Sequence, residues 1–124
     1  MTRSSLVFLI VSLIVMMAYI LYVQIFSSIT VLQLITHVHI DKIFHALGGA
    51  FIAGALFSLF GKQKYFFTLF VVFVAAISWE VIEALWDPKT LYFIEHSRSV
   101  WIKDTVIDIF FGLFGAFLYI KDPI

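Results

Sequence analysis

The sequence predicts an all-α fold, an integral membrane bundle of four transmembrane helices that forms a single domain over residues 1–124. Hydrophobic residues make up 63% of the chain and charged residues 13%, whereas soluble domains average about 45–50% and about 25%. Mean hydropathy is +1.08. The chain also holds 15 Phe, more than the interior of so short a soluble domain can bury, whereas lipid accepts them without cost.

Two apolar runs make up the first half of the predicted bundle. The first span is expected over residues 6–26, a run too long for a signal peptide and without a small-residue cleavage site, so we expect a retained anchor. The second span is expected over residues 41–60. It ends at Gly61, a residue type that favours helix C-termini, and the polar turn that follows is short. The second and third spans are therefore expected to be antiparallel neighbours.

The other two spans are expected over residues 65–86 and 101–120. Pro88 ends the third, because proline disfavours helical geometry in the residue before it. Two longer connections, 27–40 and 89–100, mix apolar and polar residues, and the second also carries aromatic ones. We expect both to be loops at the membrane interface. His37 and His39 in the first of them are expected to be solvated rather than to bind metal.

Charge and cysteine content exclude several classes of function. The formal net charge is zero, so no basic field indicates a nucleic-acid partner. The chain has no Cys, which excludes disulfides, thiolate metal sites and thiol catalysis.

Ionisable residues gather at one face of the predicted bundle. Consecutive spans alternate in direction, so the start of the second, the end of the third and the start of the fourth lie at the same face of the membrane. Each of these three segments carries two ionisable residues spaced three or four apart, which places both on one side of the helix. The six residues are Asp41, His45, Glu80, Glu83, Asp104 and Asp108. They are the predicted catalytic residues.

Small residues on the second and fourth spans predict close helix packing. They allow backbones to approach one another in lipid. They are Gly48, Gly49, Ala50, Ala53, Gly54, Ala55, Gly112, Gly115 and Ala116.

The motifs that carry these residues resemble a known group. The patterns Asp41-Lys42-x-x-His45-x-x-Gly48-Gly49, Trp79-Glu80-x-x-Glu83 and Asp104-Thr105-x-x-Asp108 look like the three signature segments of VanZ-like and YjdF-type bacterial membrane proteins. Arg98 resembles an Arg that precedes the last acidic motif in VanZ-like sequences. Glu83 and Asp108 stand where VanZ-like proteins more usually carry Gln and Asn, which favours the YjdF side of the group.

The resemblance implies a place in the bacterial cell envelope and a site, but no reaction. VanZ-like proteins are associated with resistance to glycopeptide antibiotics. We therefore expect a multi-pass protein of the cell (inner or plasma) membrane.

Three interpretations of the acidic residues stay open. They are protonated and hold helices together; or they form a proton or ion relay; or they bind a divalent metal ion. Lys42, Lys103 and Arg98 are close enough in sequence to neutralise several of them. The predicted metal ligands are His45, Glu80, Glu83, Asp104 and Asp108, a set suited to Mg²⁺, Mn²⁺, Fe²⁺ or Zn²⁺.

Two functional hypotheses follow. In the first, the protein is an envelope enzyme or binder that acts on an amphiphilic or lipid-linked small molecule, whose anionic group Arg98 and Lys103 hold. The acids and His45 then supply metal ligation or general acid and base roles. In the second, a non-catalytic membrane protein uses the cluster to bind protons or a cation, or only to fix helix packing. In both, membrane lipid is the expected partner and nucleic acid is not.

Basic residues predict an orientation once their pairing is considered. The basic residues on the N-terminal side are Arg3, Lys62, Lys64 and Lys121, and those on the other side are Lys42, Lys89, Arg98 and Lys103. Each side carries four basic residues, so the positive-inside rule alone gives no orientation. If Lys42 and Lys103 pair with neighbouring acids, both termini are expected to be cytoplasmic.

Overall fold

A computed structural model describes residues 2–26, 40–86 and 88–124, and these residues are almost entirely helical. No strand occurs among them. The helices are α1 (Arg3–Phe26), α3 (Ile40–Phe60), α4 (Tyr65–Trp86), α5 (Pro88–His96) and α6 (Arg98–Lys121). The all-α prediction is confirmed.

Most of the predicted boundaries hold to within a few residues. The third expected span coincides with α4, and the second differs from α3 by one residue. The expected loop over 89–100 is wrong, because most of it forms α5 and the start of α6. Pro88 fits the first position of α5, where the missing N–H has no partner to lose. Of the expected interfacial segment 27–40, residues 27–39 with His37 and His39 lie outside the described residues, and Ile40 begins α3.

Among the described residues, three helices are long and apolar enough to cross a membrane, which indicates a membrane protein. They are Arg3–Tyr22 within α1, Ile40–Phe60 and Tyr65–Trp86. The fourth expected span, α6, is not among them. Its first half carries Lys103, Asp104 and Asp108, and these charges set it apart from the other three helices.

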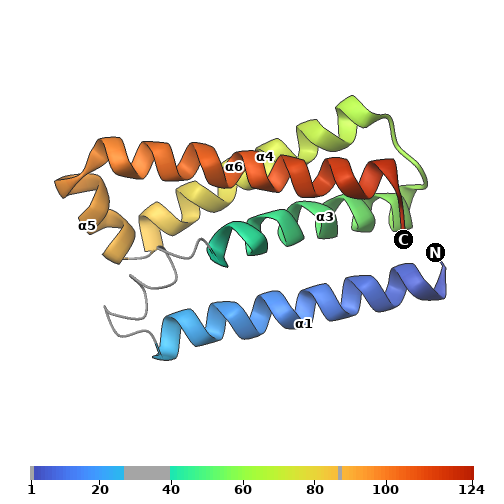
Figure 1. The fold of residues 1–124 in the computed structure, drawn as a ribbon, viewed down its shortest axis with the longest axis horizontal. Coiled ribbons are helices and arrows are strands. Elements are labelled where there is room, and N and C mark those ends of the chain that lie inside the picture. The colour runs from blue at the N-terminus through green and yellow to red at the C-terminus, as the bar shows by residue number, and fades with distance from the viewer. Residues whose placement is uncertain (1, 27–39, 87) are drawn as a thin grey trace.

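The long helices lie side by side, with α1 and α4 running against α3 and α6 (Figure 1). One end of the bundle therefore holds the beginning of α1, the turn at residues 61–64 and the end of α6. The other end holds α5 and the beginnings of α3 and α6. The most extensive contact joins α3 to α6, while α4 packs on α6 and α1 packs chiefly on α3.

Glycines allow α3 and α6 to touch through their backbones. A Cβ added at Gly49 would collide with the carbonyl oxygen of Gly112, and one added at Gly115 would collide with the carbonyl oxygen of Ala46. Close approach of this kind is how small residues stabilise helix pairs in lipid, where apolar burial gives no advantage over contact with lipid tails. The predicted small-residue contact is confirmed for these positions.

The apolar core lies in the half of the bundle that holds the termini. Its centre is Tyr119, which packs over Gly54, stacks on Phe8 with ring centroids 5.4 Å apart and meets Phe57 edge-on at 6.0 Å. The buried hydrophobic residues are Ala53, Val72, Ala116, Tyr119 and Ile120. This core fixes the rotation of α6 about its axis.

The first helix packs antiparallel on α3. Met16 lies near Gly48, and Tyr19 stacks on Phe44 with ring centroids 3.7 Å apart. Most other large side chains of α1 are exposed, so α1 lies at the border of the bundle.

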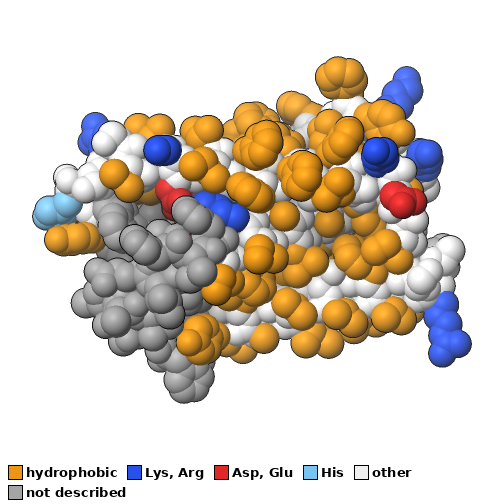
Figure 2. Space-filling view, in the orientation of Figure 1, with side chains coloured by type: hydrophobic (Ala, Val, Ile, Leu, Met, Phe, Trp, Pro, Cys, Tyr) orange, Lys and Arg blue, Asp and Glu red, His pale blue; other side chains and the backbone are white. Residues whose placement is uncertain are grey.

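Apolar side chains cover the long sides of the molecule. Figure 2 shows hydrophobic side chains along the middle of the visible face and Lys and Arg side chains towards its ends. On α4 an exposed stripe follows helical spacing and comprises Phe66, Phe70, Phe73, Ile77, Val81 and Leu85. A surface of this kind suits contact with acyl chains.

The turn between α3 and α4 ends the first of these helices tightly. Gly61 has φ +74°, the left-handed conformation that glycine adopts without strain. The Gln63 side-chain amide donates hydrogen bonds to the carbonyl oxygens of Phe60 and Gly61, at 2.8 and 3.0 Å. The predicted C-terminal glycine is confirmed.

The contact between α3 and α6 predicts which glycines tolerate a methyl group. Gly49→Ala should lower the free energy of unfolding by about 1–3 kcal/mol, because the backbones must separate. Gly48→Ala is the matched control: its added Cβ would lie 3.8 Å from Met16 Sδ, an ordinary contact. This variant should be about 0.5–1 kcal/mol more stable, because alanine favours the helix. Unfolding in detergent measures both; equal effects of the two changes would contradict the close contact.

Candidate functional site

A buried lysine lies at the centre of the ionisable residues. Lys42, in the first turn of α3, is only 3% exposed. It shares a face of the helix with Gly49 and Ala53, which are also buried, because residues 42, 46, 49 and 53 repeat at helical spacing. The face that packs on α6 therefore begins with a charged side chain.

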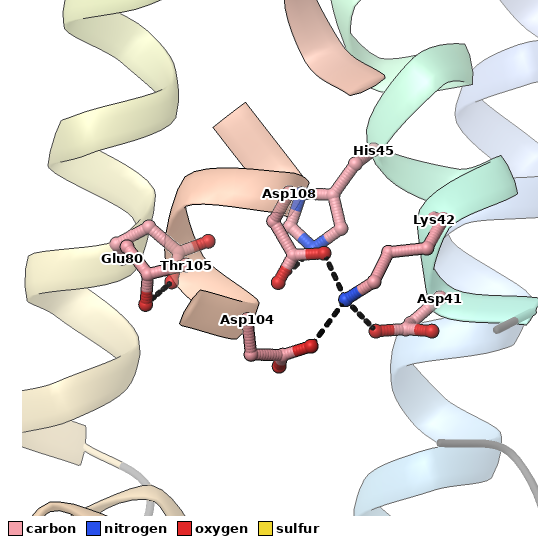
Figure 3. Close-up of polar contacts among 7 residues, drawn as sticks. All are labelled: Asp41, Lys42, His45, Glu80, Asp104, Thr105 and Asp108. Atoms are coloured by element: carbon pink, nitrogen blue, oxygen red, sulfur yellow. Dashed lines mark hydrogen bonds and ion pairs between the residues drawn. The ribbon is translucent and has the colours of Figure 1, made fainter. Parts of the chain in front are cut away.

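Three aspartates surround the Lys42 ammonium group. Lys42 Nζ lies 2.9 Å from Asp41 Oδ2, 2.5 Å from Asp104 Oδ1 and 2.5 Å from Asp108 Oδ1. Figure 3 shows the ammonium between the carboxylates, two of which come from α6. An ammonium has three N–H donors, so each can serve one carboxylate.

This arrangement compensates charges that would otherwise destabilise the bundle. Lys42 and Asp108 are both at least nine-tenths buried, and a buried charge costs several kcal/mol, on the order of 2.5–3.5 at the centre of a membrane helix on insertion scales. Asp104 and Asp108 are one turn apart and would repel each other if both were ionised. The shared ammonium offsets both the cost of burying the charges and the repulsion between the two aspartates. It also ties α3 to α6.

Asp108 links the lysine to a histidine. Its Oδ1 pairs with Lys42, and its Oδ2 lies 3.6 Å from His45 Nε2. His45 lies one turn beyond Asp41 on α3. A carboxylate beside an imidazole orients the ring, an arrangement found where histidine transfers protons or binds metal.

Glu80 extends the cluster to α4. The Thr105 hydroxyl donates a hydrogen bond of 3.1 Å to Glu80 Oε2, and the residue is 8% exposed. Among the described residues, no Lys or Arg forms an ion pair with Glu80. The glutamate is thus buried beside other acids with a hydroxyl as its hydrogen-bond donor.

Two groups of side chains bring ligand atoms within 4.8 Å of one another, as a metal ion requires. The first is Asp41, Asp104 and Asp108, and the second is His45, Glu80 and Asp108. The Lys42 ammonium already lies among the carboxylates of the first group. The second group combines an imidazole with two carboxylates, a ligand set that divalent first-row metals and Mg²⁺ accept.

Most of the six residues predicted to form the site lie together. Asp41, His45, Glu80, Asp104 and Asp108 are the members that meet. Glu83 is partly buried but belongs to neither group of possible ligands. Arg98 and Lys103, expected to hold an anionic group, are exposed at the beginning of α6, and neither forms an ion pair with another residue in the described ranges.

The central position of Lys42 and the contact from Thr105 were not predicted. From the sequence, Lys42 is expected to be one of three neutralising cations rather than part of the site. A signal was present, because Lys42 is in helical register with Ala46, Gly49 and Ala53, the small residues that mark the packing face. Thr105 is similarly one turn before Asp108 and close to the face that carries Gly112.

Comparisons with known proteins found no match, whether with protein families, with curated proteins or with solved structures.

The ion pairs predict a large difference between two lysines of the same region. Lys42→Met should lower the free energy of unfolding by about 3–5 kcal/mol, because it leaves buried carboxylates without their cation. Lys103→Met should change it by less than about 0.5 kcal/mol, because that side chain is exposed. Unfolding of both variants in the same detergent measures the difference. A Lys42→Met protein as stable as the wild type would contradict the central position of the ammonium.

Proposed function

We propose that the chain is a multi-pass membrane protein of the bacterial cell envelope whose charged cluster binds a cation in addition to the Lys42 ammonium. The proposed ligands are His45, Glu80 and Asp108. The observation that carries this proposal is the excess of carboxylates: Lys42 is the one Lys or Arg among the described residues that pairs with them.

The charge of the cluster supports a second cation. With Asp41, Glu80, Asp104 and Asp108 ionised, one ammonium leaves three negative charges in a small, partly buried volume. Asp41 Oδ1 is buried and accepts no hydrogen bond from a described residue, so no donor offsets the burial of this oxygen. Buried acids of this kind either take up protons or bind a metal ion. A divalent cation among His45, Glu80 and Asp108 would balance Glu80, which the lysine does not reach, and part of the negative charge left on the aspartates.

The type of ligand favours a hard or borderline divalent ion. Carboxylate oxygens suit Mg²⁺ and Mn²⁺, and the imidazole extends the range to Fe²⁺ and Zn²⁺. Asp108 would serve both cations, one through each oxygen, since its Oδ1 already faces Lys42 and its Oδ2 faces His45. Such an ion would fix the orientation of α4 relative to α3 and α6.

We also propose that α6 is the fourth span and that both termini are cytoplasmic. The pairing of α6 with α3 from Asp104 to Tyr119 supports the span, because its charged first half turns Asp104 and Asp108 towards Lys42. Engagement of Lys42 in ion pairs removes it from the positive-inside count and leaves four basic residues on the N-terminal side against three on the other. The charged cluster would then face the extracytoplasmic side.

Membership of the VanZ-like and YjdF-type group is part of the same proposal. It rests on the order and spacing of the three motifs. Their convergence at one end of the bundle supports it, because five of the six motif acids and histidines contribute to one cluster.

A second candidate function is binding or conversion of an amphiphile at the membrane surface. The observation that favours it is the exposure of Arg98 and Lys103 at the same end of the bundle as the cluster. Their cationic groups are free of ion pairs with described residues and could hold an anionic head group. His45, Glu80 and Asp108 would hold the cation, which would supply polarisation of that head group.

Cation binding predicts a stabilisation that depends on Glu80. A divalent ion at a hundred times its dissociation constant should raise the free energy of unfolding of the wild-type protein by about 2.7 kcal/mol. Glu80→Gln should abolish this increase, because the amide keeps the size of the side chain but not its charge. Thermal unfolding in detergent with Mg²⁺, Mn²⁺, Fe²⁺ and Zn²⁺ in turn measures it, with a chelator as reference and elemental analysis of the purified protein.

The matched control is Glu95→Gln, which removes an exposed glutamate of α5. It should respond to the ion as the wild type does. If no divalent ion distinguishes Glu80→Gln from Glu95→Gln, the proposed metal site is wrong and the cluster serves protons or packing.

The proposed orientation predicts where reporter fusions are active. A reporter inserted at the Lys62–Lys64 turn should behave as cytoplasmic, and one inserted at the beginning of α6 as extracytoplasmic. The opposite pattern would reverse the assigned face of the cluster without affecting its composition.

A further inference from the structure

The end of the bundle opposite the charged cluster is basic. Four cations lie there, one at the start of α1, two in the turn between α3 and α4, and one at the end of α6. They are Arg3, Lys62, Lys64 and Lys121, and all four are exposed. Asp122 is the acidic residue at this end among the described ranges, so the balance is positive. Figure 2 shows basic side chains spread over this end.

An open groove begins at this end and runs along α1. It has a volume of about 690 Å³ and is lined by Arg3, Ser4, Val7, Phe8, Val11 and Ile124. Arg3, Val7 and Val11 are four residues apart, so they form one line on the helix. At about 1.5 Å per residue, Val7 and Val11 lie about 6 and 12 Å deeper than Arg3. The lining thus changes from cationic and polar to purely apolar with depth.

We propose that this groove binds an anionic phospholipid, with the lipid phosphate at Arg3 and one acyl chain along Val7, Phe8 and Val11. The order of side chains matches the order of chemical groups in such a lipid. An arginine guanidinium presents paired N–H donors to a phosphate. Val7 and Val11 are 53% and 52% exposed, which leaves their side chains accessible to an acyl chain.

The other basic residues favour an anionic lipid over a zwitterionic one. Lys62 and Lys64 line a second hollow at this end together with Gln63, Tyr65 and Phe66. Aromatic residues beside lysines are typical of headgroup depth, and clustered cations attract anionic lipid surfaces. A lipid with net negative charge therefore finds compensation around the whole end of the bundle, whereas a zwitterionic lipid brings its own cation. This inference does not depend on the proposed cation site.

A lipid titration tests the proposal. Purified full-length protein in detergent is heated after addition of phosphatidylglycerol or phosphatidylcholine with identical acyl chains. Phosphatidylglycerol should raise the midpoint of thermal unfolding by several degrees more than phosphatidylcholine. Glycerol phosphate at the same concentration and ionic strength should not reproduce the shift, because it has no acyl chain to occupy the groove.

Two pairs of variants assign the effect to the groove. Arg3→Gln should lose most of the difference between the two lipids, and Arg3→Lys should keep most of it. Val7→Trp fills the groove and should lose the stabilisation by lipid. Its control is Val74→Trp, which alters a valine of α4 that is 46% exposed and lies outside the groove. This variant should keep the stabilisation by lipid.

Three results would overturn the proposal. They are equal stabilisation by both lipids, an equal shift with glycerol phosphate, and an Arg3→Gln protein that keeps the full difference. Val7 and Val74 both lie on exposed helix surfaces, so a general effect of Trp on folding would lower the midpoint of both variants alike. The midpoints without added lipid measure this effect and distinguish it from loss of lipid binding.

Discussion

The Lys42 ammonium group and its three aspartates join the packing of the bundle to its chemistry. The lysine reaches Asp104 and Asp108 because α3 and α6 lie close together at Gly49 and Gly115, where an added Cβ would collide with the backbone of the other helix. In return, the ion pairs compensate charges at the start of α6 that would otherwise disfavour its place in the bundle. The backbone contact and the ion pairs therefore depend on each other, because they lie at successive turns of the same two helices.

The helices were predictable because their apolar runs are long and clearly bounded. Because consecutive spans alternate in direction, the sequence alone also predicted that Asp41, His45, Glu80, Asp104 and Asp108 lie at one end of the bundle.

The residue at the centre of the cluster was not predictable in the same way. Adjacent residues on a helix point about 100° apart, so whether Asp41 or Lys42 faces α6 depends on the rotation of α3, which the glycine contact sets. Whether Glu80 or Glu83 faces the cluster likewise depends on the rotation of α4 about its axis, and Glu83 belongs to neither ligand group. Helix α5 was missed because its mixed residues resemble an interfacial loop, and only its packing beside α4 and α6 distinguishes the two.

The distribution of charge gives the molecule two different ends. One end gathers acids around a single buried lysine and presents Arg98 and Lys103 to the surroundings, and the other presents exposed cations beside an apolar groove. The first end suits a cation within the cluster and an anionic head group beside Arg98 and Lys103. The second suits the anionic surface of a membrane leaflet. Both follow from the same topology, because α3 and α6 run parallel, from the end of the bundle that holds α5 to the end that holds the C-terminus (Figure 1).

The most direct measurement is a double-mutant cycle between Lys42 and Asp108, read as the free energy of unfolding in detergent. If the ammonium compensates the aspartates, Asp108→Asn should destabilise the wild-type protein, because Lys42 loses its most buried partner. The same change should stabilise the Lys42→Met protein, because one uncompensated charge disappears. The resulting coupling should fall in the range of about 0.5–3 kcal/mol for residues in contact. Equal effects of Asp108→Asn in the two backgrounds would contradict the ion pair on which the arrangement of α3 and α6 depends.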